Sequence, residues 1–208
     1  MASRRRTRED DSVTRTALLD AAQAVMVDEG YAAVTTRRVG AVAGVNKALV
    51  YYYFDTMDDL FIALFRRNAE RSFERQREIL VGPQPLWGLW DAIHEQSGSA
   101  VTNEFIALAN HRKAIRDVIA EYQLRYRRLQ LDMLGGVLER YGVDTEIWPL
   151  GSVLVMMEGI SRFLQTEDAF AVNVGHQETA AVVERLIRAL EGDRLEELVP
   201  LIAESARA

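Results

Sequence analysis

Residues 35–54 read TTRRVGAVAGVNKALVYYYF, and this stretch predicts two short helices separated by a tight turn. The Thr35-Thr36 pair can cap the first helix, and Gly44 supplies the turn. The second helix is expected from about Asn46 to Tyr53, with Val45 filling the corner between the two. This order is that of a helix-turn-helix, in which the second helix enters the major groove of DNA.

Helix-turn-helix geometry also occurs as plain structure, so the residue types have to decide between structure and DNA binding. Hydroxyl, amide and ammonium groups on the second helix can contact phosphates and base edges. These groups belong to Asn46, Lys47, Tyr51, Tyr52 and Tyr53. From residue 31 to residue 54 the charged residues are Arg37, Arg38 and Lys47, all basic, although the net charge of the chain is -6. The basic character is therefore local, as a DNA-binding surface requires.

Apolar residues recur at helical spacing on both sides of this stretch, which predicts an all-α protein. A first helix is expected from near Asp11 or Ser12 to Gly30. The Thr56-Met57-Asp58-Asp59 run resembles a capping box and should start a long helix that ends near Leu80. After the breaker Gly82-Pro83-Gln84-Pro85, further helices are predicted near residues 86–95, 101–109, 112–141, 147–165, 177–190 and 195–204.

The composition excludes several classes of function. Of the 208 residues, 49% are hydrophobic and 27% are charged, which is ordinary for a folded globular chain. Because the chain contains no cysteine, disulfides and thiolate chemistry are excluded. The three histidines lack metal-site spacing, and no phosphate-binding glycine loop or nucleophile elbow occurs, so we expect no enzyme activity, metal or cofactor. No membrane-length apolar run or signal segment is present, which favours a cytoplasmic location.

From about Thr14 to Leu64 the sequence resembles the tetracycline-repressor (TetR) family of bacterial regulators. The resemblance rests on Ala21-Ala22, Asp28-Glu29-Gly30-Tyr31, Thr35-Thr36, Ala43-Gly44-Val45-Asn46-Lys47, Val50-Tyr51-Tyr52-Tyr53-Phe54 and Leu60. It implies a homodimer of all-helical subunits that binds a near-palindromic double-stranded operator. It also implies a C-terminal domain that binds a small-molecule effector and releases DNA.

The resemblance implies a phosphate contact for Thr36 and contacts to phosphates or bases for Lys47, Tyr51 and Tyr52. Met57 stands where the family commonly has a phosphate-binding Lys, so the opening arginines, Arg4, Arg5, Arg6 and Arg8, would compensate from the minor groove. Tyr51 and Tyr53 can alternatively be core aromatics. The residues predicted to contact DNA are Thr36, Arg37, Arg38, Asn46, Lys47, Ala48, Leu49, Tyr51 and Tyr52.

Together these features predict three regions: a basic flexible arm at 1–11, a three-helix DNA-binding domain at 12–56, and an effector-binding and dimerisation bundle at 57–208. Two apolar stripes are predicted either to pair with a second subunit or to form monomer core. They consist of Val153, Leu154, Met157, Ile160 and Leu164, and of Ala180, Val183, Leu186, Ile187 and Leu190. The predicted effector is apolar or aromatic, and the predicted pocket residues are Trp87, Trp90, His94, Phe105, Tyr122, Gln123, Met133, Met156 and Phe163.

The sequence thus predicts a ligand-responsive transcriptional regulator, most simply a repressor that its effector releases from DNA. The alternative is a helical protein that binds small molecules or partners without binding DNA.

Overall fold

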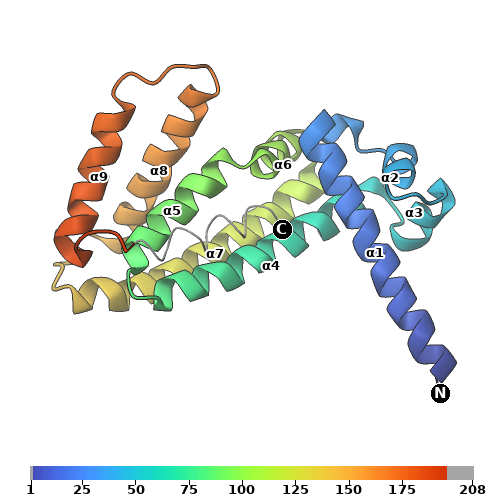
Figure 1. Ribbon diagram of the computed structural model, residues 1–208, viewed down its shortest axis with the longest axis horizontal. Coiled ribbons are helices and arrows are strands. Elements are labelled where there is room, and N and C mark those ends of the chain that lie inside the picture. Colours follow the sequence, from blue (N-terminus) through green and yellow to red (C-terminus); the bar gives the residue numbers. More distant parts are fainter. Residues whose placement is uncertain (1, 196–208) are drawn as a thin grey trace. The chain divides into compact units, whose positions relative to one another are not determined.

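The computed structural model describes residues 2–195, apart from the side chains of residues 2–10 and 97–98. In this part of the chain all regular secondary structure is helical (Figure 1), which confirms the all-α prediction. The elements are α1 (Ala2–Glu29), the 3-10 turn η1 (Tyr31–Ala33), α2 (Thr36–Val42), α3 (Lys47–Tyr53), α4 (Met57–Val81), α5 (Pro85–Gly98), α6 (Ala100–His111), α7 (Lys113–Arg140), α8 (Leu150–Asp168) and α9 (His176–Glu191). Beyond Leu195, the helix predicted at 195–204 lies outside the described residues.

Packing divides the chain into two compact units. The head unit contains the residues up to 70 together with 100–122, and the bundle unit contains 71–99 and the residues from 123 onward. Two segments of the predicted 57–208 domain, 57–70 and 100–122, therefore pack into the head. Because α4 and α7 are continuous helices, each contributes residues to both units.

Side chains cap the starts of α2, α3 and α4 as the sequence predicts. Thr35 accepts a hydrogen bond from the backbone N–H of Arg38 at 3.2 Å, and Asn46 accepts one from Ala48 at 2.9 Å. At the start of α4, Thr56 and Asp59 bond reciprocally to each other's backbone N–H at 2.9 and 3.1 Å. Each cap satisfies donors that the first helical turn leaves without an internal partner.

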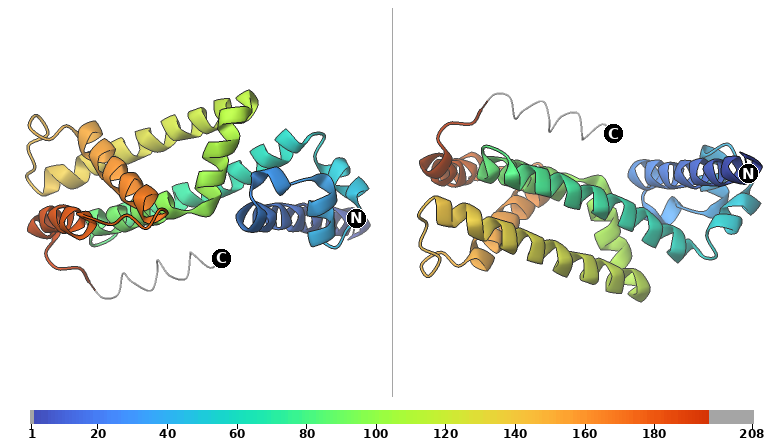
Figure 2. Two further views of the ribbon diagram at one scale, coloured as in Figure 1. Left: turned by 90° about the horizontal axis from the view of Figure 1, so that it is seen from above. Right: turned by 90° about the horizontal axis from the view of Figure 1, so that it is seen from below.

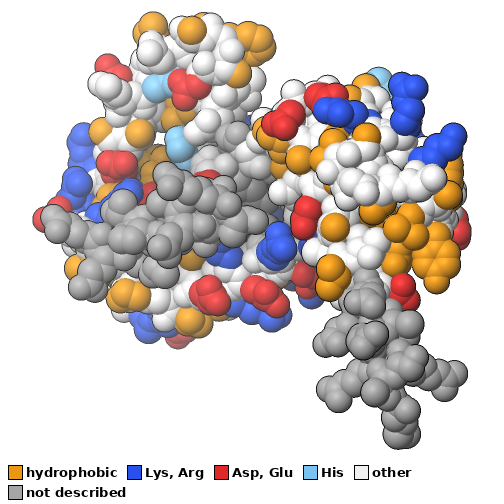
Figure 3. All heavy atoms as spheres, turned by 45° about the vertical axis from the view of Figure 1, so that its right-hand side comes forward, with side chains coloured by type: hydrophobic (Ala, Val, Ile, Leu, Met, Phe, Trp, Pro, Cys, Tyr) orange, Lys and Arg blue, Asp and Glu red, His pale blue; other side chains and the backbone are white. Residues whose placement is uncertain are grey.

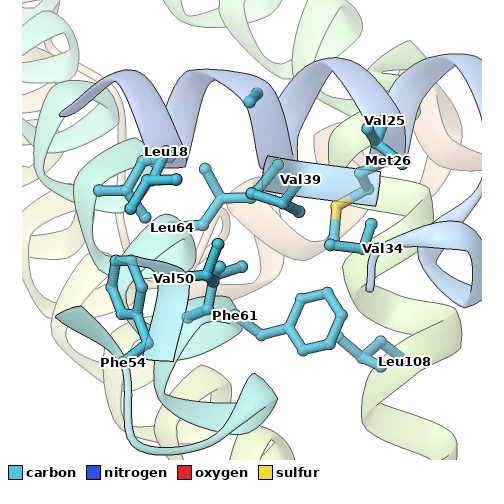
Figure 4. Packing of buried hydrophobic residues seen from close by; sticks show 14 of the residues in the cluster. Leu18, Val25, Met26, Val34, Val39, Val50, Phe54, Phe61, Leu64 and Leu108 are labelled. Atoms are coloured by element: carbon cyan, nitrogen blue, oxygen red, sulfur yellow. The ribbon is translucent and has the colours of Figure 1, made fainter. Parts of the chain in front are cut away.

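The head unit is built around one apolar core. In Figure 4 the side chains of Leu18, Val39 and Val50 point toward one another from α1, α2 and α3, and all three are at most 1% exposed. Burying each such side chain contributes about 1.5–3 kcal/mol. The core continues through Phe61 of α4 to Leu108 of α6, so the three predicted helices do not complete it alone.

The first helix begins earlier than expected. Its backbone is helical from Ala2, whereas the capping residues Asp11 and Ser12 had suggested a start near them. Residues 2–10 contain neither Gly nor Pro, so nothing in this stretch interrupts a helix that continues toward the N-terminus. The arginine side chains of this segment lie outside the described ones, and their minor-groove role stays a prediction.

The turn between α2 and α3 depends on two glycines. Gly44 adopts a φ of 69°, in the left-handed region that favours glycine, as predicted for the turn. The second glycine, Gly40, was not predicted to have a role in this turn. A Cβ at Gly40 would lie 3.0 Å from the backbone oxygen of Val45 and 3.4 Å from the Cα of Lys47. The absence of a side chain therefore allows α2 and the start of α3 to approach closely.

In the bundle unit, the carboxylate of Glu191 caps α5 from a distant part of the chain. It accepts hydrogen bonds from the backbone N–H groups of Leu86 at 2.8 Å and Trp87 at 3.0 Å, and from the hydroxyl of Tyr141 at 2.8 Å. Burial, and then the Glu191 hydrogen bond, raise the pKa of Tyr141 to about 12. These bonds connect the end of α9 to α5 and α7 above a second apolar core that includes Trp87, Leu89, Leu134 and Leu154.

We expect Gly40→Val to destabilise the head unit by about 1–3 kcal/mol, because the added methyl groups overpack the α2–α3 contact. Urea unfolding followed by circular dichroism measures this change. Gly136→Ala is the control, since a Cβ there has nothing within 4 Å and alanine gains roughly 0.5–1 kcal/mol in a helix. Equal stability of Gly40→Val and the wild type would contradict the role given to this contact.

Candidate functional site

The face of α3 that points away from the core carries the predicted DNA-contacting groups. Val50 is 1% exposed and anchors the helix in the head core. Lys47 and Ala48 are exposed, and Tyr51 and Tyr52 are 55% and 70% exposed, so Tyr51 is not a core aromatic. Leu49 is half-buried and lies at the edge of this surface. A helix that buries one side in this way presents the other to a groove of DNA.

Tyr53 contributes to the packing of the head unit more than to its exposed surface. Its ring packs against the head core, and its hydroxyl donates a hydrogen bond to Asp11 of α1 at 3.0 Å. Burial and the Asp11 carboxylate both raise the pKa of the Tyr53 hydroxyl. The alternative of a core aromatic therefore fits Tyr53.

The start of α2 adds polar groups beside α3. The hydroxyl of Thr36 lies 3.5 Å from that of Tyr51, which places both hydroxyls at one location. The guanidinium of Arg37 is exposed and makes no hydrogen bond or ion pair within the described residues. Figure 3 shows Lys and Arg side chains (blue) close to hydrophobic side chains (orange, a class that includes Tyr) on the head unit.

Arg38 differs from its neighbour because Glu29 holds it. The carboxylate of Glu29 accepts hydrogen bonds from Nε of Arg38 at 2.9 Å and from Nη2 at 2.7 Å. This bond and the charge of Glu29 raise the pKa of Arg38. A guanidinium paired in this way is less available to a phosphate than that of Arg37. The sequence offered one hint of the pair, an acidic residue just outside the acid-free stretch.

The packing of Met57 accounts for an apolar residue at the position where the family commonly has Lys. Its side chain is half-buried and packs against the head core, where it anchors the start of α4 instead of reaching a phosphate. Other contacts that position the head were not predicted. Glu104 of α6 accepts a hydrogen bond from the backbone N–H of Tyr31 at 2.6 Å, and Arg15 lies over the ring of Phe54 at 5.3 Å.

The nine predicted pocket residues do not line one place. Phe105 and Tyr122 belong to the head unit, where both rings contact Phe65. Gln123, Met156 and Phe163 are exposed. The bundle unit brings together the remaining four in or beside its core: Trp87, Trp90, His94 and Met133. Helical spacing could not reveal this division, because one period is compatible with either core.

Side chains at one level of the bundle unit connect four helices, and we call this level the polar layer. The rings of Phe73 and Tyr126 have centroids 5.5 Å apart, and Nδ1 of His94 lies 3.0 Å from the hydroxyl of Ser161. Burial raises the pKa of the Tyr126 hydroxyl. In order around the bundle, the contacts are Arg75 (α4) with Glu95 (α5), His94 (α5) with Ser161 (α8), Glu158 (α8) with Arg127 (α7), and Tyr126 (α7) with Phe73 (α4).

The outer faces of α8 and α9 carry a groove and exposed apolar side chains. The groove has a volume of about 320 Å³ and is lined by residues that include Ile160, Phe163 and Thr179. At its end, His176 contacts Glu167 at 2.9 Å, and this hydrogen bond raises the pKa of His176. The exposed apolar residues of α8 and α9 include Val155, Met156, Phe163, Val182 and Leu186, of which Phe163 also lines the groove.

The two predicted stripes are mostly core rather than surface. Leu154, Met157 and Leu164 of α8 are buried, as are Val183 and Ile187 of α9. Of the predicted stripe residues, Leu186 is among those that remain exposed, with 56% of its surface accessible. In α8 the predicted stripe is largely buried, whereas α9 buries Val183 and Ile187 and leaves Leu186 and Leu190 of the same stripe exposed.

Within residues 2–195, no three His, Asp or Glu side chains gather where they could hold a metal ion. Over the same residues, no helix is both long and apolar enough to span a membrane.

The helix α3 follows a glycine turn, is capped by Asn46 and is anchored in the core by Val50, and it leaves its other face exposed. This arrangement is that of a DNA-binding helix-turn-helix protein. Residues 18–64 match the family model described as bacterial regulatory proteins, tetR family. Over these residues the resemblance to the family that is seen in the sequence is confirmed.

Known proteins show how far the similarity extends. Over 56 residues, 27% of this chain and 28% of the relative, the chain is 43% identical to the HTH-type transcriptional regulator BetI of Rhizobium meliloti (strain 1021). Over 112 residues it is 24% identical to the HTH-type transcriptional repressor KstR2 of Rhodococcus jostii (strain RHA1), covering 54% of this chain and 55% of that one. The matches thus span about half or less of these relatives.

A solved structure shares the fold over most of the chain. It is a TetR transcription regulator from Haloarcula marismortui ATCC 43049, with a TM-score of 0.69 and 21% identity over 86% of this chain and 98% of that one. The predicted architecture of an N-terminal helix-turn-helix, a long helix and a C-terminal helical bundle is thereby confirmed.

We expect Glu29→Gln to increase DNA affinity and steepen its salt dependence, because it frees Arg38 for a phosphate. Each added phosphate contact should change the log–log salt slope by roughly 0.9. Fluorescence anisotropy with duplex DNA across a salt series measures both quantities. Asp28→Asn is the matched control, since it removes the same charge from an exposed neighbour that does not hold Arg38. A slope equal in the two variants would contradict the prediction.

Proposed function

We propose that this protein is a DNA-binding transcriptional regulator, and specifically a repressor that a small molecule releases from its operator. The observation that carries the proposal is the exposed face of α3. Lys47, Tyr51 and Tyr52 stand there on a helix without acidic residues, and the core fixes the helix from behind. Thr36, Arg37 and Asn46 supply further hydrogen-bond donors at the starts of α2 and α3. Ala48 and Leu49 offer apolar contact to a thymine methyl.

We further propose that the working form is a homodimer on a near-palindromic operator. One reading helix of seven residues is too short to specify a site alone. The uncovered apolar side chains of α8 and α9, with the groove between them, form a surface suited to a second copy. In this arrangement Met156 and Phe163 serve subunit pairing instead of the effector.

The effector binds in the bundle unit, and its signal travels through helices that the two units share. The predicted pocket residues that remain as candidates for effector contacts are Trp87, Trp90, His94 and Met133. Because α4 and α7 each contribute to the core of both units, a shift of either helix at the effector also alters the head. To move the protein from 1% to 99% released, the effector must favour the released state by about 5.5 kcal/mol.

A helical protein that binds small molecules without DNA is the alternative. The acid-free surface of α2 and α3 argues against it, because such an interaction protein gains nothing from concentrated positive charge at one helix-turn-helix. A gel shift with the DNA upstream of the protein's own gene separates the two functions.

Lys47→Ala should weaken binding to specific and random DNA alike, by about 1.5–3 kcal/mol per subunit, because a charged phosphate contact is lost. Tyr51→Phe or Tyr52→Phe should cost less, since each removes one hydroxyl. Binding titrations over a salt series test this, with Lys113→Ala as a control that removes the same charge from another exposed site of the head unit. If Lys47→Ala changes neither affinity nor salt slope, α3 does not bind DNA as proposed.

Phe163→Glu should convert the dimer to monomer without unfolding it, because the side chain is 60% exposed in the single chain and would place a charge in the subunit interface. Leu124→Glu is the control, as Leu124 is 61% exposed on a different helix of the same unit. Light scattering at micromolar concentration gives the mass of each variant. A dimer that persists in Phe163→Glu, or a monomeric wild type, contradicts the proposed interface.

A further inference from the structure

Two glutamines of the bundle unit are buried without hydrogen-bond partners. Gln76 of α4 is 1% exposed and Gln130 of α7 is 0% exposed. In both, the amide nitrogen and the amide oxygen are buried and make no hydrogen bond to the described residues. A glutamine amide offers two donors and two acceptors, and buried polar groups in proteins are nearly always paired. By contrast, the buried amide of Gln84 has partners at both atoms: its nitrogen donates to two backbone oxygens and its oxygen accepts from one backbone N–H.

The polar layer places these two amides on the facing sides of α4 and α7. Phe73 of α4 contacts Tyr126 of α7 with ring centroids 5.5 Å apart. Gln76 follows Phe73 by three residues and Gln130 follows Tyr126 by four, so each lies one turn further on the same face of its helix. The two helices run in the same direction here (Figure 2), and Leu80 and Leu134 meet in one core a further turn on. Both amides therefore face the space between α4 and α7, yet they do not bond to each other.

A third buried donor without a partner in the described part of the chain belongs to Arg127, a residue of the polar layer on α7. Arg75 is neutralised by Glu95, and Nη2 of Arg127 is paired with Glu158. The other terminal nitrogen of Arg127, Nη1, is buried and makes no hydrogen bond to the described residues. Its N–H groups and the amide N–H groups of the two glutamines are thus buried donors without an acceptor among the described residues. A carboxylate can accept several such bonds at once.

We propose that Gln76, Gln130 and Nη1 of Arg127 bind the carboxylate head of a small organic acid whose apolar body packs toward Leu80 and Leu134. This inference rests on the proposed function, because it assigns the chemical class of the effector. It changes the sequence-based expectation of a purely apolar or aromatic effector, since the head group is polar and only the body is apolar.

The test measures binding of three eight-carbon probes to the full chain by isothermal titration calorimetry. The probes are octanoate, octanamide and octyltrimethylammonium, which share an apolar chain and differ in the head group. We expect octanoate to bind tightest and the cation weakest. Gln76→Leu and Gln130→Leu should each weaken octanoate by about ten-fold, because each removes a donor to the carboxylate. The same variants should raise the thermal unfolding midpoint without ligand, since each replaces an unpartnered amide by an apolar side chain of similar size.

Gln123→Leu is the matched control, because Gln123 is exposed on the same helix and should leave octanoate binding unchanged. Gln130→Met repeats the test with an unbranched side chain if leucine disturbs the packing. The proposal is overturned if octanoate does not bind, if the cation binds better, or if both glutamine variants bind octanoate as the wild type does. Lower unfolding midpoints with unchanged binding would likewise show that the amides hold only water. DNA affinity is measured separately, so octanoate binding without any effect on DNA refutes the effector role and leaves the binding site standing.

Discussion

At Gly40 the backbone of α2 comes so close to the following turn that a Cβ would lie 3.0 Å from the oxygen of Val45. This approach fixes the start of α3, because the Val45 N–H bonds to Gly40 and the next residue, Asn46, caps the helix. Val50 then faces the core, so Lys47, Tyr51 and Tyr52 must face outward. The surface proposed to bind DNA is thus a consequence of how tightly two short helices pack.

The head unit is larger than the motif that gives it its function. Phe105 and Leu108 of α6 and Ile115 of α7 complete its core, and Glu104 holds the backbone of Tyr31. Seven-residue helices bury too little surface to be stable alone, so later parts of the chain have to cover them. Of these helices, α7 also contributes residues to the bundle unit, and this is the basis of the proposed coupling between effector binding and DNA binding.

The bundle unit contains both an apolar core and the polar layer, and the same helices contribute to both. Its apolar core, around Trp87, Leu89 and Leu154, supplies cohesion through burial. The polar layer does not contribute in that way, because its half-buried ion pairs lose part of their hydration and gain little net stability. These pairs, with the unpartnered amides of Gln76 and Gln130, support the proposed site for a second molecule, since ligand sites place few polar groups among apolar ones.

The sequence by itself determined the helix-turn-helix, its caps, the outward face of α3 and the family, because these depend on residues a few positions apart. Only the tertiary structure decided which apolar residues share a core. Phe105 joined the head and Trp90 the bundle, although both have the same helical spacing. The sequence also could not predict that Arg75 forms an ion pair with Glu95, or that Gln76 and Gln130 are both buried without hydrogen-bond partners among the described residues. Helical periodicity shows which side of a helix is buried, whereas the identity of its neighbours depends on contacts between distant parts of the chain.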